Sequence, residues 1–403
     1  MTELLAVNLD KAAVDAVRKH GASAGETIAL PNLTVTVLKP AAQEDIGSLF
    51  SRLSSQMQST DFVFNYVYRP VGSERSSNLS DVGQGVSGTK GCTPQRCYGY
   101  TMVGWQPQLA ECAAGINVGV IDTGYDKRHP AFIGRVFREP TSAQLPLPGP
   151  PAPNGHGTGV LSLLVGNPNS ATPGLIPRAQ FSVANAFFDD GRGNPISDTL
   201  SLIRALRFMW EGNVKVVNMS MAGPEDALLH RVVQDMVAMG IVIVAAAGNE
   251  GPDAPPSYPA AYPEVIAVTA VDQNLKNYMY ANRGAHIDVA APGVEIWTAM
   301  PGGREGAQTG TSFAAPFVTA IVAATYPTAE WRRGVPENPK SVLLARLSTK
   351  DLGRKQIFGR GLLQAPTTCR PGEQPALAER DNSPTAESLW PGVIQRLSLQ
   401  HQN

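Results

Sequence analysis

The sequence is poor in several features, and each shortage argues against a class of protein. Its 403 residues carry a formal net charge of only -1 and no Lys/Arg-rich block, so nothing favours nucleic-acid binding. No stretch approaches 18 uninterrupted apolar residues, so no membrane span is predicted. Aromatic residues make up 7% of the chain, yet 43% of it is hydrophobic, which is enough for one large core and a small extra domain. The composition is that of an ordinary soluble protein.

Cysteine is also scarce, and the four present are Cys92, Cys97, Cys112 and Cys369. Three pairings are formally open, and the short loop between Cys92 and Cys97 favours a local disulfide there. A zinc site is the weaker alternative, because no histidine lies nearby. A disulfide would favour a periplasmic or secreted protein over a cytoplasmic one. The first ten residues have two acids and no basic segment, so a secretory signal either has been removed or does not exist.

What the chain does contain is a serine at the start of an apolar helix. Gly310 permits a tight turn, Ser312 stands where the helix should begin, and residues 313–322 are apolar on nearly every face. A hydroxyl there faces unpaired N–H groups and the positive end of the helix dipole, where a developing oxyanion is stabilised. A plain serine N-cap is the alternative. The choice depends on whether a base and a carboxylate occur upstream.

Both occur, each at the boundary of a predicted element. Residues 116–122 form a β-branched run that ends on Asp122, as expected of a buried parallel strand with the acid at its carboxyl end. His156 opens a predicted helix between two glycines, which let a neighbouring chain come close. Taken alone, His156 could be an ordinary surface residue and Asp122 could form an Asx turn. The order Asp, His, Ser in these contexts instead predicts nucleophilic catalysis.

Five ordered motifs over about residues 98–365 resemble the subtilisin-like serine proteases. They are Val120-Ile121-Asp122-Thr123-Gly124, Asn154-Gly155-His156-Gly157-Thr158, Val217-Asn218-Met219-Ser220, Ala245-Ala246-Ala247-Gly248-Asn249-Glu250-Gly251 and Gly310-Thr311-Ser312-Phe313-Ala314-Ala315-Pro316. The resemblance implies an α/β fold with a doubly wound parallel sheet, and endopeptidase activity. It also implies a triad of Asp122, His156 and Ser312, with the Asn249 amide completing the oxyanion hole.

The same resemblance implies a substrate-binding surface, and the small residues Ala222, Ala247 and Ser257 in it predict a pocket that takes medium or large apolar side chains. The members of the surface are Ser220, Met221, Ala222, Gly223, Ala247, Gly248 and Ser257. The family usually has glycine where Ala222 stands, so the extra methyl is expected to narrow the pocket or tilt the backbone. Tyr258-Pro259 matches a cis peptide bond of the family. No metal or other cofactor is expected for catalysis; family members often bind structural calcium, but no EF-hand-type loop is evident.

Residues 1–70 predict a separate small domain with the order β-α-β-β-α-β, a ferredoxin-like pattern. The expected strands are 4–9, 27–30, 34–38 and 61–68, and the expected helices are 10–20 and 43–57. The region resembles the propeptide of many subtilisin-like proteases, which assists folding and inhibits the enzyme. An unrelated α+β domain without an inhibitory role is the alternative.

The remaining boundaries follow from composition. Residues 71–97 are polar and glycine-rich and predict a flexible linker. The resemblance implies that this segment contains the self-cleavage point. Residues 98–365 form the predicted catalytic domain, in which strands 181–188, 214–220, 241–247 and 265–271 alternate with helices 197–210 and 225–240, as in a parallel sheet. Residues 366–403 are a tail rich in Pro, Glu, Gln and Ser.

The predicted function is that of a serine endopeptidase that is made as an autoinhibited precursor. Its partners would be protein or peptide substrates and its own N-terminal domain, acting as an intramolecular inhibitor. A pseudoprotease scaffold that only binds partners is one alternative, although such proteins generally lack a triad or oxyanion residue and all four are present here. An intact enzyme that stays latent until it is processed is the other.

Overall fold

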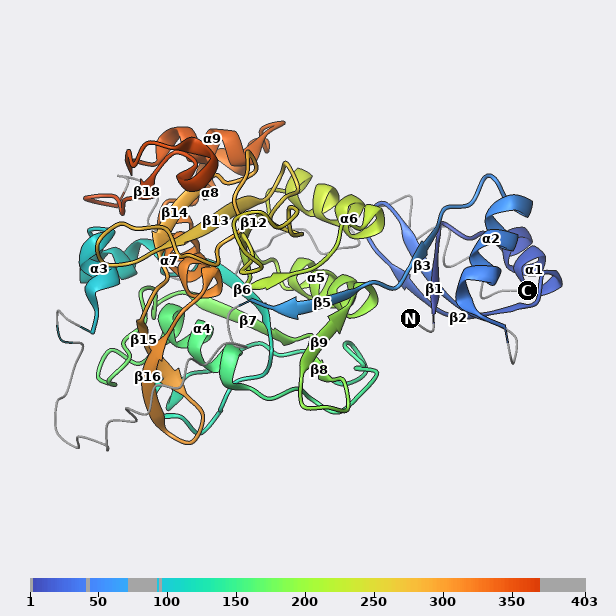
Figure 1. The fold of residues 1–403 in the computed structure, drawn as a ribbon, viewed down its shortest axis with the longest axis horizontal. Helices are drawn as coiled ribbons and strands as arrows, with labels where there is room; N and C mark the ends of the chain where they lie inside the picture. The colour runs from blue at the N-terminus through green and yellow to red at the C-terminus, as the bar shows by residue number, and fades with distance from the viewer. Residues whose placement is uncertain (1–2, 41–43, 72–92, 94–95, 370–403) are drawn as a thin grey trace.

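The larger part of the chain is built on an eight-stranded sheet, seen in the computed structural model, which describes residues 3–40, 44–71, 93 and 96–369 (Figure 1). The strand order is β17-β18-β14-β13-β12-β10-β6-β7. Their bounds are β6 Asn117–Asp122, β7 Gln180–Asn185, β10 Val216–Met219, β12 Val242–Ala246, β13 Ile266–Val271, β14 Val289–Pro292, β17 Thr349–Lys350 and β18 Leu362–Leu363. Neighbouring strands are parallel except β17, which runs antiparallel to β18. The expected parallel sheet is therefore confirmed apart from this edge strand.

Helices cover both faces of this sheet, because successive strand residues point to opposite sides. Val216 and Val244 belong to a core with α4 (Gly155–Val165) and α7 (Thr311–Ala324). Val217 and Ile243 belong to a second core with α5 (Thr199–Glu211) and α6 (Ala227–Ala238). Every residue of α7 is buried, as its apolar sequence predicts. The other helices of the larger part are α3 Tyr98–Met102, η1 Pro107–Ala113, η2 Pro130–Phe132, α8 Thr328–Trp331, α9 Pro339–Arg346 and α10 Lys355–Phe358.

The N-terminal part forms a second, four-stranded antiparallel sheet in the order β2-β3-β1-β4. Its elements are β1 Leu4–Val7, α1 Lys11–Lys19, β2 Ala22–Ala29, β3 Thr34–Pro40, α2 Ile46–Gln56 and β4 Phe62–Phe64. The side chains of Asp10 and Asp45 cap the two helices by accepting backbone N–H bonds. Strand β2 begins at Ala22, five residues before the expected start, because the pairing shifts register between Ala24 and Thr27 and this hides the strand alternation in the sequence.

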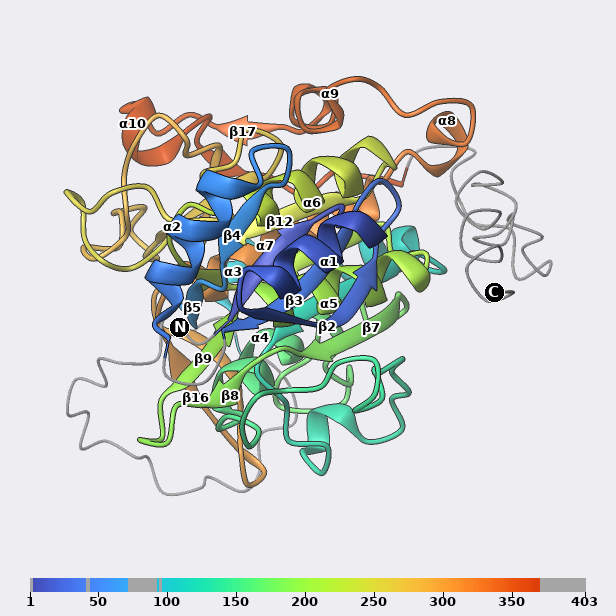
Figure 2. The same cartoon turned by 90° about the vertical axis from the view of Figure 1, so that its right-hand side faces the viewer.

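The two faces of the four-stranded sheet pack against different parts of the molecule. Leu4 lies in a small core with Leu49 and Leu53 of α2. Its neighbour Leu5 points to the other face and joins the core of α5 and α6. Figures 1 and 2 show the sheet between the pair α1 and α2 and the pair α5 and α6. The second face of the N-terminal sheet is thus covered by the larger part of the chain.

The expected single strand over residues 61–68 is wrong, because the chain changes sheets at Asn65. Strand β4 stays in the N-terminal sheet, whereas β5 (Val67–Pro70) joins another sheet in the order β11-β5-β9-β8. The Asn65 amide donates to Asp198 Oδ2 at 3.1 Å and accepts from Leu200 N at 3.0 Å, and these bonds hold the crossing point. The other strands of this sheet are β8 Phe188–Asp189, β9 Pro195–Asp198 and β11 Met221–Ala222.

The expected strand over residues 181–188 is also divided, into β7 and β8. Asn185 ends β7, and its side chain accepts a hydrogen bond from Phe187 N at 3.1 Å, which turns the chain between the two strands. A hairpin that the sequence did not reveal, β15 (Ile296–Met300) with β16 (Arg304–Gln308), leads into α7. The remaining predicted elements differ from the observed ones mainly at their ends.

Cys112 and Cys369 form a disulfide with a Cα–Cα distance of 5.3 Å. Cys97 also takes part in a disulfide, and Cys92, the partner expected for it, lies outside the described residues. The Tyr258–Pro259 bond is cis, as predicted. Among the described residues, no helix has the length and apolar character needed to cross a bilayer.

Candidate active site

Asp122 and His156 meet at the carboxyl edge of the eight-stranded sheet. Asp122 is the last residue of β6, His156 is the second residue of α4, and both side chains are buried. His156 Nδ1 lies 2.6 Å from Asp122 Oδ1. The close approach requires Gly157, because a Cβ there would lie 2.3 Å from Thr123 O. The glycine beside the histidine therefore lets the helix start against the end of the strand.

His156 is held in a state that favours its protonated form. Its second ring nitrogen, Nε2, lies 3.1 Å from the backbone oxygen of Val71. Burial by itself lowers the pKa of His156, but the charge and hydrogen bond of Asp122, together with the Val71 carbonyl, outweigh burial and raise the pKa above its ordinary value. With Nδ1–H donating to Asp122, Nε2 can donate to Val71 only as an imidazolium.

Ser312 lies at the start of α7, as predicted. Gly310 precedes the helix with φ 154°, a conformation that favours glycine. The Ser312 hydroxyl donates to Ser220 O at 3.5 Å, and the Ser220 hydroxyl donates to Ser312 O at 3.0 Å. The rings of His156 and Phe313, the residue after Ser312, have centroids 5.6 Å apart. The structure therefore brings the start of α7 beside His156, while Ser312 Oγ and His156 Nε2 bond backbone carbonyls.

Asn249 is tied to the same helix start. Its Oδ1 accepts hydrogen bonds from Thr311 N at 3.1 Å and from Thr311 Oγ1 at 3.0 Å. Its Nδ2 is buried and has no hydrogen-bond partner among the described residues. A buried amide donor without a partner is unfavourable. The donor belongs to a residue that is bonded to Thr311, the neighbour of Ser312.

A sequence model described as the Subtilase family matches residues 113–361, more than half of the chain. The chain belongs to this family. Subtilisin E of Bacillus subtilis (strain 168) is 35% identical over 261 residues, which cover 62% of this chain and 64% of that protein. Subtilisin BL of Lederbergia lenta is 31% identical over 267 residues, which cover 64% and 91%. The Major intracellular serine protease of Bacillus subtilis (strain 168) is 31% identical over 267 residues, which cover 62% and 80%. The match thus spans just under two thirds of the length of the first of these relatives.

In this subtilase, residues 220–223 lie beside the chain that leaves the N-terminal sheet. β11 pairs antiparallel with β5, so that Met221 faces Pro70 and Ala222 faces Arg69. Val71 N donates to Ser220 O at 3.2 Å. Gly223 exchanges two backbone hydrogen bonds with Tyr258, at 2.9 and 3.0 Å. The segment 220–223 therefore holds an extended chain along one side.

The side chain of Val71 lies in a small apolar cluster beside the segment 220–223. It is buried against Ala222 and Ala246. All three residues of the run 245–247 are small, and the strand alternation brings Ala246 to this cluster.

The other predicted residues of the binding surface support the neighbouring loop. Gly248 N donates to Thr311 Oγ1 at 3.2 Å. Ser257 Oγ accepts from Asn282 Nδ2 at 3.0 Å and donates to Glu250 at 3.4 Å. Ala247 is fully buried, and its N–H donates to Val268 O at 3.0 Å. Ala247 and Gly248 directly precede Asn249 in the chain, and Ser257 lies in the loop that follows it.

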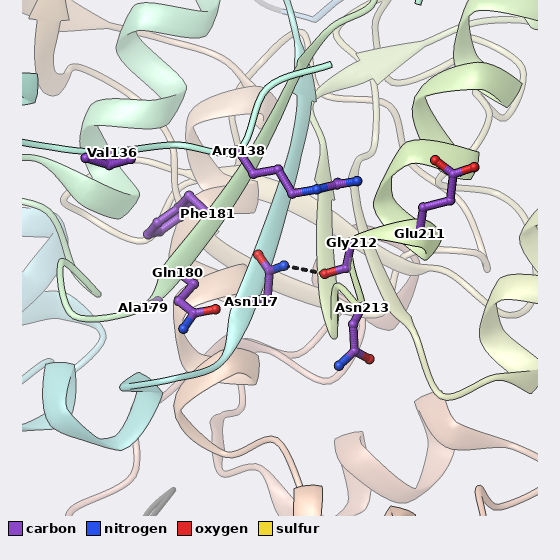
Figure 3. A pocket seen from close by; sticks show the side chains of 9 residues that line it. All are labelled: Asn117, Val136, Arg138, Ala179, Gln180, Phe181, Glu211, Gly212 and Asn213. Carbon is purple, nitrogen blue, oxygen red and sulfur yellow. Dashed lines mark hydrogen bonds between the residues drawn. The ribbon is translucent and has the colours of Figure 1, made fainter. Parts of the chain in front are cut away.

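A separate pocket lies at the opposite end of strands β6 and β7 (Figure 3). Asn117 begins β6 and Gln180 begins β7, whereas Asp122 ends β6. The Asn117 amide spans one side of the pocket and donates to Gly212 O at 2.6 Å. The remaining lining residues are Val136, Arg138, Ala179, Phe181, Glu211 and Asn213. Asn117 and Asp122 are the two ends of β6, so this pocket is separated from Asp122 by the length of that strand.

Proposed function

We propose that the chain is a serine endopeptidase that hydrolyses protein or peptide substrates through an acyl-enzyme. The observation that carries the proposal is the buried Asp122–His156 pair, which lies beside the helix start that bears Ser312. A serine hydroxyl is a weak nucleophile at neutral pH, so it needs a base within reach to accept its proton. His156 is that base, and Asp122 fixes its tautomer and stabilises the imidazolium that forms.

In this reaction Ser312 Oγ attacks the carbonyl carbon of the scissile bond, and its proton passes to His156 Nε2. The negative charge that moves to the carbonyl oxygen is held by Ser312 N–H and the unpartnered Asn249 Nδ2. His156 then gives its proton to the leaving amine, and the acyl group remains on Ser312. Water, activated by the same histidine, releases the acyl group and restores the serine. None of these steps needs a cofactor.

We further infer that the chain is made as a precursor in which residues 1–71 inhibit the site. The order β-α-β-β-α-β of this part supports a ferredoxin-like propeptide domain. Strand β5 lies between β9 and β11, and the carbonyl of Val71 points at the proposed base. An extended chain in this position resembles the acyl side of a cleaved substrate. Self-cleavage would then occur on the carboxyl side of Val71.

The disulfide between Cys112 and Cys369 supports an oxidising location. We therefore propose that the enzyme acts in the periplasm or is secreted. To test this location, the chain is produced in cells with and without export, and Cys112 and Cys369 are then labelled with a thiol reagent. Free thiols in active protein would contradict it.

A fluorophosphonate probe tests the proposed activity. The full chain should be labelled slowly, and labelling should become fast after brief proteolysis of residues 72–92 and removal of the N-terminal part. Ser312→Ala should abolish both labelling and peptide cleavage, whereas Ser341→Ala, which changes an exposed serine of α9, should alter neither. If no form of the wild-type chain is labelled, the protein is a binding scaffold. If Ser312→Ala still cleaves at the wild-type rate, another residue is the nucleophile.

A further inference from the structure

Tyr68 occupies a pocket that is built around its ring. The side chain is fully buried, although it belongs to the segment that enters the site from the N-terminal part. Its ring lies over Gly223, where a Cβ atom would come within 2.2 Å of Tyr68 Cδ1. The strand pairs Tyr68 with Ser197 of β9. Glycine at position 223 is therefore what makes room for an aromatic ring at this place.

The closed end of the pocket is polar. Tyr68 Oη donates to Asp226 Oδ2 at 3.4 Å, and the Thr199 hydroxyl donates to the same oxygen at 2.6 Å. Asp226 is itself only 1% exposed. A buried carboxylate is unfavourable beside an apolar ring, but it suits a ring that carries a hydroxyl. The pocket thus contains a group that can distinguish tyrosine from phenylalanine.

Asp226 is also held rigidly. It is the N-cap of α6, and its Oδ1 accepts from Leu228 N at 2.9 Å and Leu229 N at 3.2 Å. The Tyr262 hydroxyl donates to the backbone oxygen of Asp226 at 2.8 Å. Burial raises the pKa of the Asp226 carboxyl, and the hydrogen bonds from Thr199 and the helix start oppose that rise. These bonds fix the position of Oδ2, so it recognises a hydroxyl at one place only.

Val71 lies with its carbonyl at His156, and Tyr68 precedes it by three residues. In a substrate cut after the residue at the place of Val71, the Tyr68 pocket therefore receives the fourth residue before the cut. On the basis of the proposed function, we propose that Asp226 is a specificity-determining residue that makes the enzyme prefer tyrosine over phenylalanine at this fourth position.

The expected preference follows from the strength of such a bond. A hydrogen bond to a charged group contributes enough to change an equilibrium or rate by about 10- to 100-fold. A site built to bond a hydroxyl also rejects the analogue that lacks it more strongly than an apolar pocket would. Because Thr199 still bonds Asp226 Oδ2 when the substrate hydroxyl is missing, we expect the preference to stay within this range.

Three chromogenic peptides test the proposal on the wild-type chain after it has processed itself. They are Tyr-Arg-Pro-Val-p-nitroanilide and its analogues with phenylalanine or O-methyltyrosine in first place. The tyrosine peptide should have a kcat/KM about 10- to 100-fold above that of the phenylalanine peptide. O-Methyltyrosine should be no better than phenylalanine, because its ether oxygen cannot donate. Equal or better cleavage of the phenylalanine peptide would overturn the assignment.

A variant then locates the effect at Asp226. Asp226→Ser keeps an N-cap for α6 but cannot reach the substrate hydroxyl, so the ratio of the two kcat/KM values should fall to about one. A ratio measured in one preparation does not depend on the fraction of folded enzyme. Asp235→Ser, which removes an acid later in the same helix, should keep the wild-type ratio. If Asp226→Ser also keeps it, the recognition of tyrosine lies elsewhere.

The probe separates failure of this inference from failure of the proposed function. Wild-type protein that is labelled at Ser312 but cleaves the peptides without preference, or cleaves none of them, overturns only the assignment of the pocket. Wild-type protein that is neither labelled nor active overturns the endopeptidase proposal, and the assignment of the pocket with it.

Discussion

The two main sheets of the molecule differ in how their faces are covered. The eight-stranded sheet has its own helices on both sides, with α4 and α7 on one face and α5 and α6 on the other. The four-stranded sheet has α1 and α2 on one face only, and its second face rests on α5 and α6. The larger part therefore covers both faces of its sheet with its own helices, whereas one face of the smaller sheet is covered only by the larger part. Release of the N-terminal part would expose that face to water, together with the surface of α5 and α6 that it covers.

Substitution of two adjacent leucines of β1 should give the largest effect on the contact between the two parts. Leu5 packs on the shared face and Leu4 packs inside the small core, and both are fully buried. Replacing a buried leucine by alanine costs about 2–5 kcal/mol. Leu5→Ala should therefore weaken inhibition of processed enzyme by added residues 1–71 by up to several hundredfold, with little change in the melting temperature of the added segment.

Leu4→Ala is the matched comparison, because it should lower the melting temperature of the segment itself. Inhibition constants and circular dichroism melting of the two variants separate the effects. If Leu5→Ala inhibits as well as wild type, the shared face does not hold the two parts together.

Asn249 lies in the larger part, together with the other residues that we propose act in catalysis. Asn249→Ala should lower kcat by about 10²–10³ with a much smaller change in KM, because its amide would bond the oxyanion mainly in the transition state. Inhibition by residues 1–71 should change little, since none of their described contacts involves the Asn249 side chain. Steady-state kinetics on one peptide substrate measure both quantities. An unchanged kcat would remove Asn249 from the oxyanion hole.

The contact between the two parts at His156 gives the smallest of these effects, and it depends on pH. The pKa of His156 is raised above its ordinary value while the Val71 carbonyl faces it. The bond to Val71 is therefore fully present below the ordinary histidine range and is lost as pH rises through the raised pKa. In the separate segment 1–71 the terminal carboxylate of Val71 takes the place of this carbonyl, so its affinity should fall by at most about tenfold per pH unit in that window.

Truncation by one residue is the control for this pH effect. Residues 1–70 lack the Val71 carbonyl, so their inhibition constant should vary much less between pH 6 and 9, a range of about three units around the histidine pKa. Both constants are measured with the same processed enzyme. A pH dependence that is equal for the two segments would show that another group is responsible.

Much of the larger part could be predicted from local sequence. Asp122, His156 and Ser312 each stand at the boundary of an element that its own neighbours define, and the structure places all three at such boundaries. Buried parallel strands are continuous apolar runs, so their order along the chain can be recognised without knowing their partners.

The contacts between the two parts could not be predicted in this way, because they join residues far apart in sequence. The alternation through residues 61–68 continues unbroken while the chain changes sheets, and the partners of Asn65 are Asp198 and Leu200. A strand pattern shows which residues share a face but not which sheet they join. For the same reason, Asp226 could be recognised only as the start of a helix, and not as the partner of Tyr68.

The disulfide from Cys112 to Cys369 turns the larger part into a closed covalent ring. Asp122, His156 and Ser312 all lie inside this ring, whereas Val71 and everything before it lie outside. A cut after Val71 frees the N-terminal part without opening the ring. A single cut anywhere between the two cysteines leaves both fragments joined, so a protease that attacks its own copies would stay in one piece until it is reduced or cut twice.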